Sequence, residues 1–145
     1  MVCIYCASAT RVINSRAQKK TVGVWRRRIC LNCKAVFSTT EQADLSSSVM
    51  VLSKKGVLMP FYREKLLSSL LNALAGNERQ FEYAAQLCTT IVGKLLRKNT
   101  AQLGTDEIIS CASTTLKNFN HQAYARYVAE YASDSASIKL RPSSG

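Results

Sequence analysis

The chain has 145 residues, of which 47% are hydrophobic, and this length suits one domain or two small ones. It contains no run of about 18 apolar residues, so no segment is predicted to span a membrane. The formal net charge of +11 is concentrated at one end, because residues 1–40 carry eight lysines and arginines and no acidic residue. This asymmetry predicts that the N-terminal third contacts a polyanion.

Two Cys-x2-Cys pairs open the chain, Cys3 with Cys6 and Cys30 with Cys33. Each pair can direct two thiolates at one ion, so together they predict a closed tetrahedral zinc site with four sulfur ligands. Disulfides, unrelated buried thiols and a rubredoxin-like iron site are the alternatives. Reduced cysteines favour a cytoplasmic protein, and a metal ligand at position 3 leaves no room for a signal peptide before it.

Between the pairs, residues 12–13 and 22–25 resemble the two arms of a hairpin that is too small to fold without metal. Arg26, Arg27 and Arg28 adjoin the second cysteine pair. The guanidinium group of arginine forms bidentate hydrogen bonds with phosphates or with the edge of guanine, so this run is a candidate nucleic-acid contact. In a strand, Arg26 and Arg28 would face one way and Arg27 the other, so the three would not all enter one groove.

The polar stretch 38–48 has no regular apolar period and is predicted to be a linker or hinge. A short hairpin is predicted next, from apolar residues 49–52 and 57–59. Lys54 and Lys55 occupy its turn, and Gly56 lies where a positive φ is needed.

From Tyr62 onward the apolar spacing predicts four helices. A leucine stripe over 66–74 ends at Gly76, and a second stripe covers 84–96. Thr105 is expected to cap the third helix. The fourth is expected over about 121–133, with tyrosines 124, 127 and 131 on one face, followed by a frayed tail.

No catalytic centre is predicted. The single histidine, His121, starts a helix and has no acidic pair beside it by motif, while Cys88 and Cys111 lie in apolar helical patterns typical of a core. Walker and Rossmann phosphate loops are absent. Lys54 and Lys55, with Lys65 one turn into the first helix, remain the candidates for contact with a polyphosphate.

Five stretches carry a resemblance to a known family. Residues 10–16 (TRVINSR), 26–33 (RRRICLNC) and 37–41 (FSTTE) are similar to the zinc ribbon of the NrdR family, the bacterial repressors of ribonucleotide reductase genes. Residues 56–66 (GVLMPFYREKL) resemble the start of an ATP-cone, and residues 123–131 (AYARYVAEY) resemble its end. The similarity runs in order over about residues 1–133.

The resemblance implies an α+β protein in three parts. A small rubredoxin-like zinc ribbon at 1–44 would bind DNA, and a mostly helical ATP-cone at 45–134, with a short β-hairpin and about four helices, would sense nucleotide and form oligomers. Residues 135–145 would be a flexible tail. The implied protein is a cytoplasmic, nucleoid-associated repressor rather than an enzyme. It would hold one structural Zn2+, bind ATP and dATP, and bind double-stranded operator DNA as a homo-oligomer.

Candidate contacts follow for both ligands. The arginines of the basic loop and its flank are expected to contact DNA: Arg11, Arg16, Arg26, Arg27 and Arg28. The resemblance places the nucleotide on the hairpin, the first helix and the last: Val51, Lys54, Lys65, Tyr124 and Tyr131. Lys55, beside Lys54 in the turn, is added to these candidates because of its charge. Ser53 stands where the family has a lysine, and Met59 stands where it has a glutamate.

Two other functions remain open from the sequence. The basic loop alone would suffice for an RNA- or ribosome-binding zinc-ribbon protein, although that function gives no role to a cone. A regulatory subunit that gates ribonucleotide reductase directly would use the cone without DNA.

Overall fold

The computed structural model describes residues 1–19 and 22–139. These form two compact units, an N-terminal unit, Met1–Asp44, and a C-terminal unit that begins at Leu45. The chain is of mixed α and β structure, as expected from its sequence.

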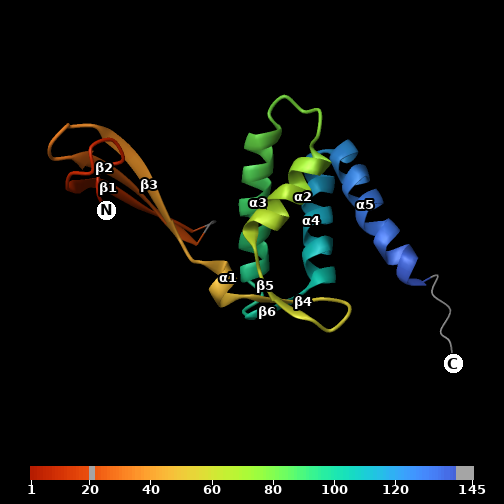
Figure 1. The fold of residues 1–145 in the computed structure, drawn as a ribbon. Coiled ribbons are helices and arrows are strands. Elements are labelled where there is room, and N and C mark those ends of the chain that lie inside the picture. Colours follow the sequence, from red (N-terminus) through yellow and green to blue (C-terminus); the bar gives the residue numbers. More distant parts are fainter. Residues whose placement is uncertain (20–21, 140–145) are drawn as a thin grey trace. The chain divides into compact units, whose positions relative to one another are not determined.

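The N-terminal unit is a three-stranded antiparallel sheet with the order β1-β2-β3 (Figure 1). Its strands are β1 (Thr10–Gln18), β2 (Gly23–Cys30) and β3 (Val36–Gln42). The third strand was not predicted. The linker proposed for residues 38–48 is wrong for residues 38–42, which pair with β2, and for residues 45–48, which form a short helix. Because few residues of this sheet are buried, β3 is polar and lacks the alternation that identifies a half-buried strand.

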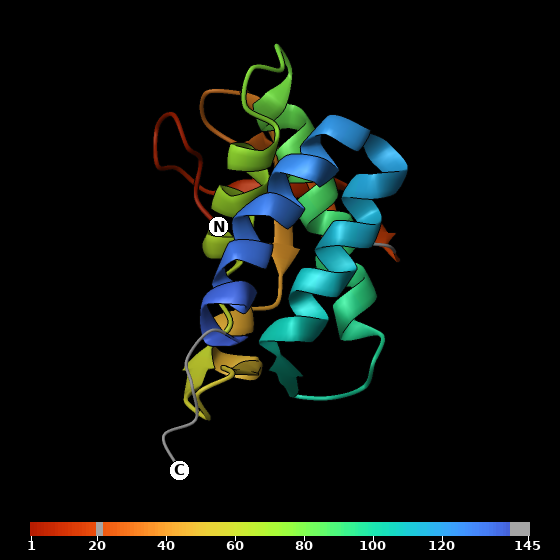
Figure 2. The same cartoon turned by 90° about the vertical axis from the view of Figure 1, so that its right-hand side faces the viewer.

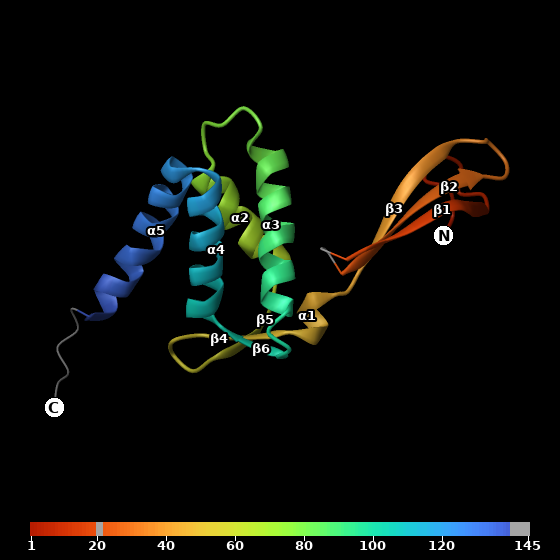
Figure 3. The same ribbon diagram turned by 180° about the vertical axis from the view of Figure 1, so that it is seen from behind.

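The C-terminal unit has a second small sheet, ordered β5-β4-β6, at one end of its long helices (Figure 3). A short helix, α1 (Leu45–Ser48), precedes β4 (Met50–Leu52) and β5 (Leu58–Pro60), which form the predicted hairpin. Gly56 has a φ of 79° in its turn, as the sequence suggests. The strand β6 (Gln102–Gly104) pairs in parallel with β4 and was not predicted, since three residues show no usable period.

Four longer helices complete this unit (Figure 2): α2 (Arg63–Ala73), α3 (Gln80–Leu96), α4 (Thr105–Phe119) and α5 (His121–Lys139). Gly76 was predicted to cap this first long helix, but the C-cap of α2 is Leu74, and Gly76 lies two residues later in the following turn with a φ of 86°. Gly104 rather than Thr105 is the N-cap of α4, because Glu107 turns back and its carboxylate accepts a hydrogen bond from the Gly104 N–H at 2.9 Å. The helix α5 continues past Ser133, so it includes the first residues of the expected tail.

One hydrophobic cluster holds the C-terminal unit together, and the predicted helical stripes supply most of it. Leu70, Ile91 and Leu116 are completely buried in it, one each from α2, α3 and α4. Cys88 is also fully buried, and Cys111 packs at its edge, in keeping with their predicted place in the core. Among the described residues, no helix is both long and apolar enough to cross a membrane.

Candidate metal centre and nucleotide pocket

The four patterned cysteines converge on one point, with their sulfur atoms within 4.8 Å of one another. The Sγ–Sγ distance is 3.7 Å from Cys3 to Cys33 and 3.5 Å from Cys6 to Cys30. Tetrahedral zinc with bonds of about 2.3 Å places its sulfur ligands about 3.8 Å apart, so the cluster fits one zinc ion. A disulfide needs about 2.05 Å, and all six cysteines are free, which excludes the disulfide alternative.

The two Cys-x2-Cys turns share one backbone geometry. The first cysteine of each donates its N–H to the carbonyl five residues on, from Cys3 to Ser8 at 2.8 Å and from Cys30 to Ala35 at 2.9 Å. Ala7 and Lys34, the residues that follow the two turns, have left-handed φ values of 60° and 62°. This conformation costs about 1–2 kcal/mol in a residue other than glycine, so we expect metal binding to hold both turns in place.

Backbone N–H groups point at the sulfur atoms. Those of Asn32 and Cys33 each lie 3.4 Å from the Sγ of Cys30. Hydrogen bonds from the side chain and backbone of Ser8 lower the pKa of Cys6 to about 5. Such bonds favour the thiolate form of Cys6 and Cys30, which is the form that binds zinc.

The five arginines expected to contact DNA lie on β1 and β2. Arg11, Arg16 and Arg27 are exposed, whereas Arg26 and Arg28 are half-buried. Arg26 forms an ion pair of 2.7 Å with Glu41 of β3, and Arg28 donates a hydrogen bond to the hydroxyl of Thr10 at 3.4 Å. The structure thus divides the predicted set into three exposed arginines and two that bind neighbouring strands.

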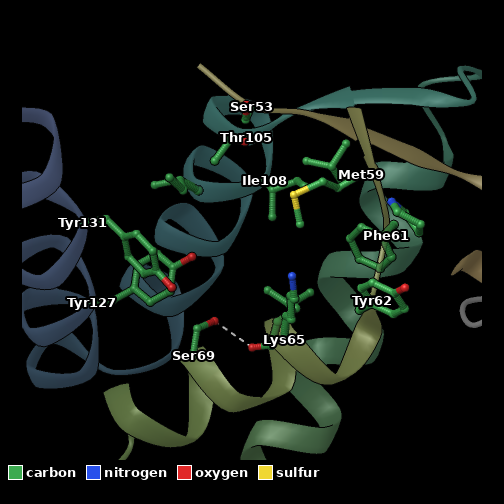
Figure 4. Close-up of a pocket in the computed structure, with 14 residues that line it drawn as sticks. Ser53, Met59, Phe61, Tyr62, Lys65, Ser69, Thr105, Ile108, Tyr127 and Tyr131 are labelled. Carbon is green, nitrogen blue, oxygen red and sulfur yellow. Dashed lines mark hydrogen bonds between the residues drawn. The ribbon is translucent and has the colours of Figure 1, made fainter. Parts of the chain in front are cut away.

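A cavity of about 290 Å³ lies inside the C-terminal unit, between the small sheet and helices α2, α4 and α5 (Figure 4). Its wall is mostly apolar, with Phe61 and Ile108 among the residues that line it. Lys65 extends from α2 into this space in Figure 4, with its ammonium group 5.4 Å from the centre of the Tyr62 ring. An apolar wall with a single lining cation suits a flat, uncharged ring that carries an anionic group.

Two tyrosines of α5 form one side of the cavity. The rings of Tyr127 and Tyr131 lie 4.6 Å apart between centroids, at an angle of 44°. Tyr127 is only 2% exposed, and this burial raises the pKa of its hydroxyl, so the ring remains neutral. The pair therefore offers a neutral aromatic surface against which a nucleobase could stack.

The cavity brings together some of the predicted nucleotide contacts and not others. Val51, Lys65 and Tyr131 line it, as do Ser53 and Met59. Lys54 and Lys55 lie on the exposed hairpin turn outside the lining, and Lys54 pairs with Asp106 of α4 at 3.2 Å.

Tyr124, which the resemblance assigns to the nucleotide, is not among the residues that line this cavity. It packs instead against His121, with 5.9 Å between ring centroids, and lies 5.8 Å below the ammonium group of Lys117. Tyr127 lines the cavity in its place, although the sequence analysis assigned it only to a helix face. The signal that could have found it is the four-residue spacing to Tyr131, which places both side chains one above the other on a helix.

Two family models match the chain. The description "Transcriptional repressor NrdR-like, N-terminal domain" matches residues 1–41, and "ATP cone domain" matches residues 49–136. Proteins named "Transcriptional repressor NrdR" from Brucella ovis and Brucella abortus (strain 2308) are each 33% identical over 139 residues. These matches cover 95% of this chain and 87% of each relative.

These similarities agree with the geometry of both units. The zinc-ribbon match ends in β3 and contains the four converging cysteines, which together identify a structural zinc site rather than an iron site. The second match contains the whole cavity and identifies an adenine-nucleotide sensor. The chain therefore belongs to the NrdR family of transcriptional repressors, with a zinc ribbon followed by an ATP-cone.

Proposed function

We propose that this protein represses ribonucleotide reductase genes by binding operator DNA through residues 1–44, under the control of ATP and dATP bound in the cone, residues 45–134. The observation that carries the proposal is the presence, in one chain, of an arginine-bearing zinc ribbon and a cavity lined by two adjacent tyrosines and a lysine. The zinc ribbon alone would not account for a nucleotide signal, and the cavity alone would not account for DNA binding.

The charge of the N-terminal unit supports a nucleic-acid partner. Its first 40 residues carry no acidic side chain, and three of its arginines are exposed on the sheet. Each phosphate that such a cation neutralises releases condensed counterions, so affinity falls steeply with salt. If the affinity of the wild-type protein for DNA did not depend on salt concentration, the proposal of an interface dominated by phosphate contacts would be wrong.

The cavity supports adenine nucleotides as the signal. We place the base beside Tyr127 and Tyr131 and the phosphates toward Lys65, which is the single lysine among the described residues that line the cavity. At about 290 Å³ the cavity lies at the lower limit of the about 300–1,000 Å³ usual for ligand sites. The outer phosphates would then extend beyond it, and the turn that bears Lys54 and Lys55 is the nearby source of positive charge.

A nucleotide can control DNA binding only if it binds one assembly of the protein better than another. We propose that dATP favours a homo-oligomer whose ribbons are spaced for two operator half-sites. ATP would favour an assembly in which the ribbons are not spaced for the two half-sites. In this role the protein acts on the chromosome in the cytoplasm.

The nucleotide site is tested by the variant Lys65→Ala, with Lys117→Ala as the matched control because Lys117 is an exposed lysine outside the cavity. A hydrogen bond to a charged group contributes about 1.5–3 kcal/mol, so calorimetry should show dATP binding about 10- to 100-fold weaker in Lys65→Ala. The control should bind as wild type does. Equal affinities for dATP in all three proteins would show that the nucleotide does not bind in this cavity.

A basic zinc ribbon could also bind RNA, since phosphate contacts carry no sequence information. Competition between duplex promoter DNA and a structured RNA of equal length separates the two partners. Preference for the RNA would overturn the proposed repressor function.

A further inference from the structure

The strand β1 contains a β-bulge. Val12 lies opposite Arg28 and Asn14 lies opposite Arg27, so Ile13 has no partner on β2. Side chains alternate between the two faces of a sheet, and residues directly opposite each other on paired strands share a face. The extra residue at Ile13 therefore reverses the alternation along β1.

This reversal places Arg11 and Arg16 on the same face, although their odd spacing of five residues would otherwise separate them. Arg11 lies opposite Ile29, and Arg16 lies opposite Trp25, while Arg27 occupies the position between these two on β2. We call this side of the sheet the arginine face. Its residues from the three strands are Arg11, Asn14, Arg16, Gln18, Gly23, Trp25, Arg27, Ile29, Val36, Ser38, Thr40 and Gln42.

The two faces differ in charge and in their internal contacts. The arginine face has three exposed arginines and no acidic residue. The opposite face holds Arg26 and Arg28, and both are bound within the sheet, to Glu41 and to Thr10. An anion that approached the opposite face would meet the carboxylate of Glu41, whose side chain is 71% exposed.

We propose that the arginine face is the surface that binds duplex DNA, and that Arg26 and Arg28 stabilise the sheet without contacting DNA. This inference rests on the proposed function and specifies its interface. The partners of Arg11 and Arg16 on β2, Ile29 and Trp25, are four residues apart, which corresponds to about 13 Å and is close to the roughly 12 Å width of the major groove. Arg11 and Arg16 can therefore reach phosphates on the two sides of the groove, with Arg27 between them.

The centre of the face suits the reading of bases. Arg27 and Asn14 lie opposite each other there, and both are exposed. Arginine binds guanine through O6 and N7, and asparagine binds adenine through N6 and N7, both bidentately in the major groove. We therefore assign Arg27 and Asn14 to base edges, and Arg11 and Arg16 to the phosphates that fix position.

Trp25 provides a built-in reporter. It is the single tryptophan of the chain, it is half-buried, and it lies on the arginine face directly opposite Arg16. DNA bound to this face should change the tryptophan emission, whereas DNA bound to the opposite face should leave it unchanged.

The test compares equal charge changes on the two faces of the full-length protein. Arg11→Gln, Arg16→Gln and Arg27→Gln remove one charge each from the arginine face, and Arg26→Gln and Arg28→Gln are the matched controls. Zinc content is measured for every variant. Binding is followed by fluorescence anisotropy over a range of salt, with ATP or dATP present. The probes are a duplex from the promoter of the ribonucleotide reductase genes of the same genome and a shuffled duplex of equal composition.

We expect Arg11→Gln and Arg16→Gln to weaken binding to both duplexes equally and to lower the salt slope by about one each. Arg27→Gln should reduce the preference for the promoter duplex by about 5-fold or more, since a bidentate base contact discriminates by about 1–3 kcal/mol. Arg26→Gln and Arg28→Gln should bind DNA as the wild type does. If Arg28→Gln loses zinc, Arg26→Gln alone is the control.

Three results would be decisive against parts of this account. Weaker DNA binding by Arg26→Gln with full zinc content would overturn the assignment of the face and leave DNA binding intact. Trp25 emission that did not change at saturating promoter duplex would likewise overturn the assignment of the arginine face while leaving DNA binding intact. Failure of the zinc-loaded wild type to bind either duplex under any nucleotide condition would instead overturn the proposed function itself.

Discussion

Among the described residues of the N-terminal unit, Cys3, Cys30 and Phe37 are the only buried hydrophobic ones, and two of the three are zinc ligands. The C-terminal unit instead buries a continuous cluster that runs from Val49 to Tyr127. A metal ion can thus replace a hydrophobic core, so most residues of this thin sheet remain exposed or half-buried. The larger core of the cone supports the wall of the cavity, since Phe61, Leu66 and Tyr127 belong to both.

The largest predicted effect is the loss of zinc. Binding of a structural zinc ion is worth about 10–16 kcal/mol in small metal-dependent folds, so Cys30→Ser should unfold the N-terminal unit and abolish DNA binding. Nucleotide binding by the cone should be unchanged, because its core contains no zinc ligand. Metal analysis, circular dichroism and calorimetry with dATP measure the three properties.

Cys111→Ser is the control for the loss of a thiol, since Cys111 is half-buried in the cone and outside the zinc cluster. It should keep its zinc and its affinity for DNA. Loss of dATP binding in Cys30→Ser would mean that the two units do not fold separately.

A smaller effect is expected from a substitution in the core of the cone, and it should destabilise the C-terminal unit while leaving the zinc ribbon intact. Leu70 is completely buried, so Leu70→Ala should lower the free energy of unfolding of this unit by about 2–5 kcal/mol through lost transfer energy and a cavity. The same change at Leu58, which is 51% exposed, should cost much less. Urea unfolding, followed together with zinc content, tests whether the damage stays in the cone. If Leu70→Ala released its zinc at the same urea concentration at which the cone unfolds, the independent unfolding of the two units would be contradicted.

The smallest effect concerns backbone conformation alone. Gly76 has a φ of 86°, and a Cβ built there would meet no atom within 4 Å. Gly76→Ala should therefore cost about 1 kcal/mol, because alanine disfavours positive φ even where it has space. Gly76→Asn should cost less, since asparagine tolerates this region better. A thermal-unfolding series of the three proteins checks the order, and an alanine variant as stable as wild type would contradict it.

Local patterns predicted well what local chemistry determines. The spacing of Cys3, Cys6, Cys30 and Cys33 identified the metal cluster, because each pair positions its sulfurs through one short turn. The leucine stripe of α2 was equally plain, since one helix face is buried along its length. Both features depend on residues that are close in sequence.

What was missed depends on pairing between distant segments. The strand β6 joins β4 from about fifty residues away, and β3 is recognisable only through its register with β2. The bulge at Ile13 likewise exists only in relation to β2, so the sequence could not show that Arg11 and Arg16 share a face. Tyr124 and Tyr127 lie on the same helix, and the packing of α5 against α2 and α4 determines which of them meets the cavity.

The central claim is that adenine nucleotides in the cone control how copies of the protein assemble. Its most direct test is the light-scattering mass of the zinc-loaded protein with no nucleotide, with ATP and with dATP, for wild type and Lys65→Ala. The account predicts that ATP and dATP give different masses in the wild type, and that this difference is lost in Lys65→Ala. The same mass for the wild type in all three conditions would contradict it.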